Sequence, residues 1–146
     1  MRNTRISLRQ LLLIDAVTCA AMGVLLAFGS GPLAQWTNLP APLLFYAGAA
    51  LLPITAFMAF VATRAVVPAW AAWTIVAGNV LWVGGSLWVL ASGWVLPNAL
   101  GRAFVAVQAV AVALLAWLEG TAAQDGSRRT ALAGSSRATV IDNGAG

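Results

Sequence analysis

Apolar residues fall into four long runs, separated by short stretches rich in glycine, proline or polar residues. The runs cover about residues 8–28, 42–64, 68–92 and 99–119. At about 1.5 Å per residue, each is long enough to cross a hydrocarbon core of about 30 Å. The pattern therefore predicts an all-α integral membrane protein, with a four-helix transmembrane bundle in residues 1–120.

Glycine, proline and asparagine mark the ends of these runs. The cluster 29–32 ends the first run, Pro42 suits the first turn of the second, and Asn98 is a candidate N-cap for the fourth. Pro53 removes a backbone donor near the middle of the second run, which predicts a kink there. Because few residues separate the second run from the third, we expect these two helices to form a tight antiparallel hairpin.

Two further segments differ from the spans. Leu33, Trp36 and Leu39 recur at helical spacing, which predicts a short interfacial segment with Trp36 at the level of the headgroups. From Thr121 onward the chain becomes small and polar and its helical periodicity fades. We therefore expect residues 121–146 to form a disordered cytoplasmic tail.

The arginines predict an orientation. Of the eight, Arg102 alone lies on the side opposite the termini, and the others lie in the leader, the loop at 64–68 and the tail. Because positive residues favour the cytoplasmic side, both termini are expected in the cytoplasm of a multi-pass cell-membrane protein. The N-terminal run also resembles a signal peptide, but Asp15 interrupts it and its length favours an uncleaved anchor.

Composition restricts the chemistry. The chain is 61% hydrophobic and 8% charged, with one cysteine and no histidine, so the commonest metal ligand and general base are missing. The net charge of +4 fits binding to anionic lipid headgroups. A nucleic-acid site would need a basic face interleaved with aromatic residues, and the sequence does not predict one. We expect no catalytic, cofactor or metal site, and as partners the lipid bilayer and a homo-oligomer or larger membrane complex.

One acid lies within the first span, and each other span carries a polar side chain at a similar predicted depth. An acid inside a membrane is costly and normally faces a protein interior or a wet cavity. We expect these side chains to meet as an intramembrane polar cluster. Its members are Asp15, Thr18, Thr55, Asn79 and Gln108.

Two interpretations of this cluster remain open. In the first, Asp15 loads and releases a proton at a transport site. In the second, Asp15 is a structural clamp that hydrogen-bonds to Asn79, Gln108 or the carbonyl freed by Pro53, at about 0.6 kcal/mol per bond. Glu119, at the predicted end of the fourth helix, is expected on a solvated rim near Arg64.

Small residues form a strip along the fourth span that allows close approach of another helix. The strip consists of Ala106, Ala109, Ala113 and Ala116. It favours a non-enzymatic accessory or self-associating membrane component of bacterial type. The alternative is a small proton-coupled transporter or channel that uses Asp15.

The chain also contains a weak internal similarity. An offset of 64 residues places Asp15 over Asn79, Leu26 over Leu90 and Gly29 over Gly93. This pattern suggests two duplicated helical hairpins, which would be parallel repeats because each contains an even number of spans.

Overall fold

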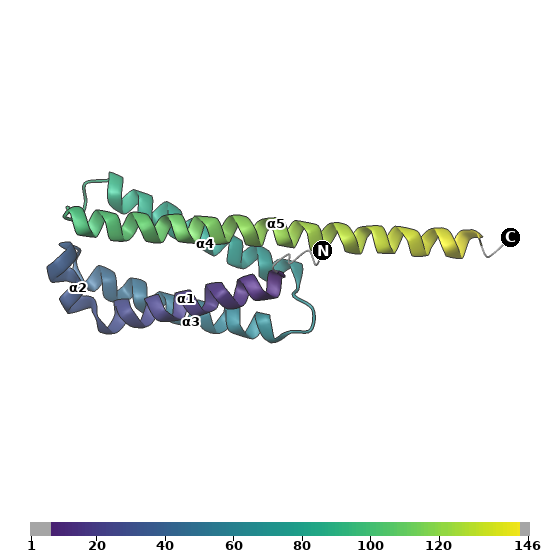
Figure 1. The fold of residues 1–146 in the computed structure, drawn as a ribbon, viewed down its shortest axis with the longest axis horizontal. Coiled ribbons are helices and arrows are strands. Elements are labelled where there is room, and N and C mark those ends of the chain that lie inside the picture. The colour runs from purple at the N-terminus through teal and green to yellow at the C-terminus, as the bar shows by residue number, and fades with distance from the viewer. Residues whose placement is uncertain (1–6, 144–146) are drawn as a thin grey trace, which may run out of the picture.

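The computed structural model describes the backbone of residues 7–143 and the side chains of residues 7–135. Within that range the protein is all-helical, with five helices and no strand (Figure 1). The helices are α1 (Leu8–Phe28), α2 (Ser30–Thr37), α3 (Ala41–Thr63), α4 (Ala69–Ala91) and α5 (Ala99–Asn143). All except α2 are long and apolar enough to cross a membrane, which confirms the four predicted candidate spans.

Side-chain caps fix the starts of α1 and α5. Ser7 and Gln10 form a capping box, in which Gln10 N donates to Ser7 Oγ at 3.3 Å and Ser7 N donates to Gln10 Oε1 at 2.9 Å. Asn98 Oδ1 accepts from Gly101 N at 2.9 Å, so the predicted N-cap is confirmed. At the other end of α1, Gly29 is the C-cap, as the glycine and proline cluster predicted.

The predicted interfacial segment is the short helix α2, which starts almost immediately after α1. Asn38 ends it in the left-handed conformation, with φ of 56°. Trp36 is 64% exposed near the end of the helix. Such exposure suits a side chain at headgroup level, although the position of the bilayer stays a prediction.

The long helices pack as two pairs: α1 against α3, and α4 against α5 (Figure 1). The tight hairpin expected between α3 and α4 is therefore wrong. A short loop joins these helices, but they make little contact with each other beyond the rings of Phe57 and Trp70, whose centroids are 6.2 Å apart. Close packing of α1 on α3 explains the pairing, because a Cβ on Gly48 would lie only 2.7 Å from Gly23 O.

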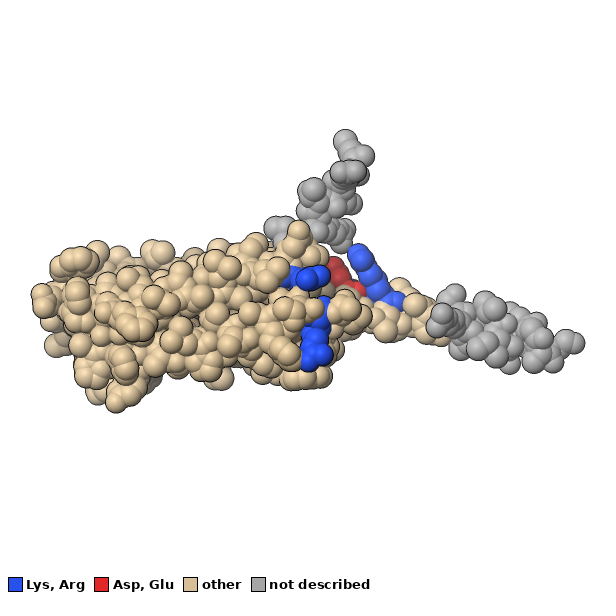
Figure 2. Space-filling view, turned by 90° about the horizontal axis from the view of Figure 1, so that it is seen from below, with Lys and Arg blue, Asp and Glu red and all other residues tan. Residues whose placement is uncertain are grey.

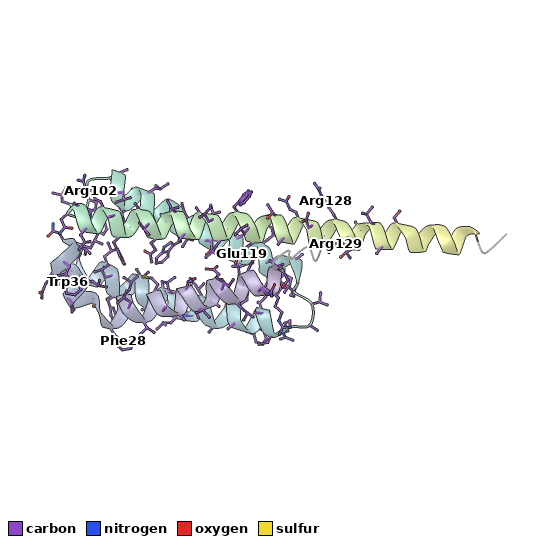
Figure 3. All side chains as sticks on the ribbon, in the orientation of Figure 1. Phe28, Trp36, Arg102, Glu119, Arg128 and Arg129 are labelled. Carbon is purple, nitrogen blue, oxygen red and sulfur yellow. The ribbon has the colours of Figure 1, made fainter. Side chains whose placement is uncertain are left out.

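Apolar side chains cover the outside of the four long helices. Phe28, labelled at the outer edge in Figure 3, is 83% exposed, and Val17 and Leu81 are 67% and 76% exposed. Proteins dissolved in water rarely expose large contiguous apolar surfaces. Together with the four candidate spans, this exposure indicates a multi-pass membrane protein.

The fourth span continues much further than the sequence suggested. We predicted a helix end near residue 119 and disorder from Thr121, whereas α5 is helical to Asn143 and projects beyond the bundle (Figure 1). The predicted helix end is wrong because no proline follows Pro97, and each glycine costs a helix only about 1 kcal/mol. Side chains 124–135 are exposed on this projecting part, and residues 144–146 lie outside the described residues.

The bundle has two distinct ends. At the terminal end, α1 begins and α5 projects outward; at the loop end lie α2 and the connection 92–98 between α4 and α5 (Figure 1). On the face shown in Figure 2, arginine side chains gather at the terminal end. Arg102 lies at the loop end (Figure 3). Which end faces the cytoplasm stays a prediction.

Candidate functional site

Two acids lie buried inside the bundle, joined by one asparagine. Asp15 on α1 and Glu119 on α5 are both 0% exposed, and Asn79 on α4 is 6% exposed. Asn79 Nδ2 donates to Asp15 Oδ2 at 2.8 Å and to Glu119 Oε2 at 3.1 Å. Because both acids accept from the same amide nitrogen, their carboxyl groups lie close together. We call Asp15 and Glu119 the carboxyl pair.

The carboxyl pair connects the half of the bundle formed by α1 and α3 with the half formed by α4 and α5. Asp15 belongs to the buried face of α1, next to Ala16 and one turn before Cys19. Glu119 comes from the other side, on the part of α5 that faces α1 (Figure 3). Asn79 extends the buried face of α4 that begins at Ala71. Three helices thus bring one polar side chain each to the same place.

Glu119 was not expected there. Its predicted position on a solvated rim near Arg64 is wrong, since the side chain is fully buried and bonded to Asn79. The sequence did hold a signal for this. Several buried positions of α5 are separated by three, four or seven residues, which is the spacing of one helix face. These positions are Val105, Ala109, Ala116, Glu119 and Ala123.

Around Asp15, the structure separates the predicted neighbours. Asn79 bonds to the carboxyl group, whereas Thr18 Oγ1 donates to the main-chain oxygens of Ile14 and Asp15, at 3.1 and 2.9 Å. Cys19 Sγ is the second donor to the carboxyl, 3.6 Å from Asp15 Oδ1. The hydroxyl group of Thr18 is therefore hydrogen-bonded within its own helix and not to the carboxyl group of Asp15.

Thr55 and Gln108 do not join the carboxyl pair. Thr55 Oγ1 is buried without a hydrogen-bond partner and is not among the cavity-lining residues. Gln108 lines the cavity described below, but about eleven residues separate it from Glu119, or about 16 Å along α5. The predicted depth of Gln108 was wrong because it was counted from residue 119, whereas the helix continues past that point.

A partly open cavity of about 850 Å³ lies between the two packing pairs. Its walls come from α1, α3, α4 and α5 and are mainly apolar, with the rings of Phe57, Trp82 and Phe104 among them. Asp15 and Asn79 belong to its lining and Glu119 does not, so the carboxyl pair meets this space through Asp15. The polar side chains in the lining are Asp15, Thr18, Cys19, Thr74, Asn79 and Gln108.

A second set of polar contacts connects the helix pairs at the loop end. Asn38 Nδ2 donates to Leu96 O and Asn98 Nδ2 donates to Trp36 O, both at 2.7 Å. Asn98 N also donates to Thr37 O at 3.1 Å. We call the Asn38 and Asn98 side-chain bonds the asparagine clamp. The two packing pairs are thus joined by polar contacts at the loop end and again at the carboxyl pair.

The predicted alanine strip divides between two environments. Ala109 and Ala116 are 5% and 8% exposed inside the bundle, whereas Ala106 and Ala113 are exposed on the outer surface of α5. The strip is therefore not one continuous face for a partner. Its buried members instead allow α5 to pack within its own chain.

Within residues 7–135, no group of three or more histidine, cysteine or acidic side chains could hold a metal ion. Fold and site together define an all-helical chain with four candidate spans and a buried acidic pair. Comparison of the chain with protein-family models, curated proteins and solved structures gives no match.

Proposed function

We propose that this protein is a small proton-coupled carrier and that the carboxyl pair holds and releases the coupling proton. The observation that carries the proposal is the sharing of one Asn79 amide by two fully buried acids beside a cavity. Ionisable residues within membranes are costly, and they commonly mark proton or substrate pathways.

The hydrogen bonds favour a proton on the pair. Two buried carboxylates at such close range repel each other, and no described arginine bonds to either acid to offset this charge. Asn79 supplies donors to both acids and Cys19 supplies one to Asp15, but Glu119 Oε1 has no donor. A proton held between Asp15 and Glu119 reduces the repulsion and adds a donor where one is missing.

The arrangement of the helices suits alternate opening. Each packing pair is internally close-packed, whereas the cavity separates the pairs over much of their length. Small rigid-body movements between such halves are a common way to expose a central site to either side. Loss of the proton from the carboxyl pair would weaken one of the two junctions and favour opening at the terminal end.

The proposed location is the cell membrane of a bacterium, with both termini in the cytoplasm. The described arginines at the terminal end support this orientation, by the preference of positive residues for the cytoplasmic side. In that orientation the carboxyl pair lies nearer the cytoplasm than the loop end does.

Proteoliposomes that enclose a pH indicator test the proposal. We expect at least one solute from a panel of small apolar cations, anions and neutral molecules to move protons through the wild type. Asp15→Asn should abolish this flux while the protein remains folded. Asp125→Asn, the same change on the exposed part of α5, should preserve it. Absence of proton movement with every solute, or full flux in Asp15→Asn, would refute the proposal.

An accessory component that self-associates is the second candidate. Ala106 and Ala113 are exposed, and Ala113 borders a shallow recess with Val80 and Trp117 on the outside of α4 and α5. If this face joins two copies, Ala106→Leu with Ala113→Leu should dissociate an oligomer isolated in mild detergent. A monomeric wild type would eliminate this candidate.

A further inference from the structure

We infer that the cavity binds a small organic monocation with an apolar body, whose ammonium group lies at the carboxyl pair. This inference names the substrate class and rests on the proposed function for its role in transport. It starts from the lining, in which Asp15 is the acid and no residue is basic, and from the apolar walls.

Charge selects against an anion. Asp15 is acidic, and none of the residues around the cavity is basic. An anion would lie beside two buried acids without a cation to pair with it, in a setting that screens charge poorly. An ammonium group instead provides up to three N–H donors for carboxylate oxygens.

The charge of the carboxyl pair distinguishes a cation from a neutral ligand, and a ligand in the cavity meets this charge through Asp15, because Glu119 is not among the lining residues. A charged donor offsets the cost of burying this charge better than a hydroxyl group does. A neutral molecule would also leave the charge of the pair uncompensated after the proton departs.

The walls indicate the rest of the ligand. Trp82 lies about one turn of α4 beyond Asn79, and both line the cavity. Phe57 and Phe104 provide further aromatic surface. Aromatic faces attract organic cations as well as apolar groups, and the volume of about 850 Å³ is within the usual range for drug-sized ligands.

Exchange of one monocation for one proton preserves the charge of the site. When the cation arrives, the shared O–H bond breaks and its proton passes to water. The ammonium N–H groups then donate to the carboxylates in its place. No covalent bond to the ligand forms, and no further reactant is needed.

Three probes that share one apolar body test this inference by calorimetry on the purified full-length protein. They are 4-phenylbutylamine, 4-phenylbutanol and 4-phenylbutanoate, which are cationic, neutral and anionic at neutral pH. We expect the amine to bind at least about tenfold more tightly than the alcohol, because its bonds are charge-assisted, and the acid to bind most weakly. Titration in buffers of different ionisation enthalpy should show about one proton released per amine bound.

Two variants locate the binding. Asp15→Asn removes the acid that lines the cavity and should lose the preference for the amine over the alcohol, whereas Asp125→Asn should keep it. Ala111→Trp fills the cavity at a position that lines it away from the acids, so it should weaken all three probes. This second variant tests the location even if Asp15→Asn does not fold.

The outcomes separate the substrate class from the proposed function. Tighter binding of the amine without proton release would support the cationic class and contradict proton coupling. Equal binding of amine and alcohol, or no binding of any probe, would overturn the cationic class. If the cationic class were overturned in this way, proton flux in the proteoliposomes would still support the carrier function.

Discussion

Asn38 and Asn98 each donate a side-chain hydrogen bond to the main-chain carbonyl two residues before the other. The acceptors are Leu96 O and Trp36 O, at 2.7 Å in both cases. Because Asn38 belongs to the half formed by α1 and α3 and Asn98 to the half formed by α4 and α5, this exchange joins the two halves of the bundle. The asparagine clamp closes the loop end, and the carboxyl pair joins the halves nearer the terminal end.

The clamp predicts a measurable loss of stability. Asn98→Asp keeps the oxygen that caps α5 but removes the amide donor to Trp36 O, so it should cost about 1 kcal/mol. Asn38→Asp should cost a similar amount through the bond to Leu96 O. Unfolding by SDS in mixed micelles, followed by tryptophan fluorescence, measures both changes.

Gln35→Glu is the matched control for the clamp. It makes the same change of amide to carboxyl in the same region, but Gln35 is exposed and has no described hydrogen bond. We expect its stability to equal that of the wild type. If Gln35→Glu cost as much as Asn98→Asp, the clamp would have no specific role.

Close contact between α1 and α3 predicts that Gly48 tolerates no side chain. A Cβ there would lie 2.7 Å from Gly23 O, and main-chain atoms cannot move aside as a flexible side chain can. Gly48→Ala should therefore cost about 1 to 3 kcal/mol, in the range for overpacking. The same unfolding assay measures this loss.

Gly85→Ala provides the comparison. No atom lies within 4 Å of a Cβ at Gly85, and the residue lies within α4. Alanine there should be neutral or stabilise the helix by up to about 1 kcal/mol. Equal effects at Gly48 and Gly85 would show that the helices α1 and α3 do not touch as described.

Asn79 predicts a dependence of stability on pH. Asn79→Ala removes a donor from both acids, which should cost about 1 to 3 kcal/mol at neutral pH. The proton shared at neutral pH already supplies one donor to the pair, so the loss should grow as the pH rises and this proton leaves. Besides Glu119, the titratable group that faces Asp15 is Cys19, whose Sγ donates to Asp15 Oδ1.

Thr74→Ala tests whether the pH effect belongs to the carboxyl pair. Thr74 lies on the same helix and lines the same cavity, but its hydroxyl donates only to Trp70 O. Its removal should have a small effect that does not change with pH. A loss in Asn79→Ala that stays constant as the pH rises would count against a shared proton.

Much of the fold follows from local signals in the sequence. Hydropathy predicted the four candidate spans, the cluster at 29–32 predicted the end of α1, and Asn98 predicted the start of α5. These features depend on residues that are close together in the chain. They are therefore readable without knowledge of the packing.

Features that depend on packing were harder to predict. Loop length suggested that α3 and α4 pair, whereas the contact of Gly23 with Gly48 decides that α1 pairs with α3. Glu119 was misplaced because the change in composition after Thr121 suggested a helix end, although buried positions continue to Ala123. Because the end of this helix was predicted too early, Glu119 was predicted on the rim of the bundle and not in the site.

The weak similarity between the two halves of the sequence can be compared with the geometry of the site. The offset of 64 residues that aligns Asp15 with Asn79 also separates two side chains that bond to each other at 2.8 Å. The packing pairs α1 with α3 and α4 with α5 correspond to the two hairpins that the offset suggested. Duplication of an ancestral hairpin stays a prediction.

Infrared spectroscopy of the purified protein at neutral pH tests the shared proton most directly. We predict a carbonyl stretching band from a protonated carboxyl group, present in the wild type and in Asp125→Asn. The band should disappear in the double variant Asp15→Asn with Glu119→Gln. A wild-type spectrum at neutral pH without a protonated carboxyl band would contradict the account, because both buried acids would then be ionised.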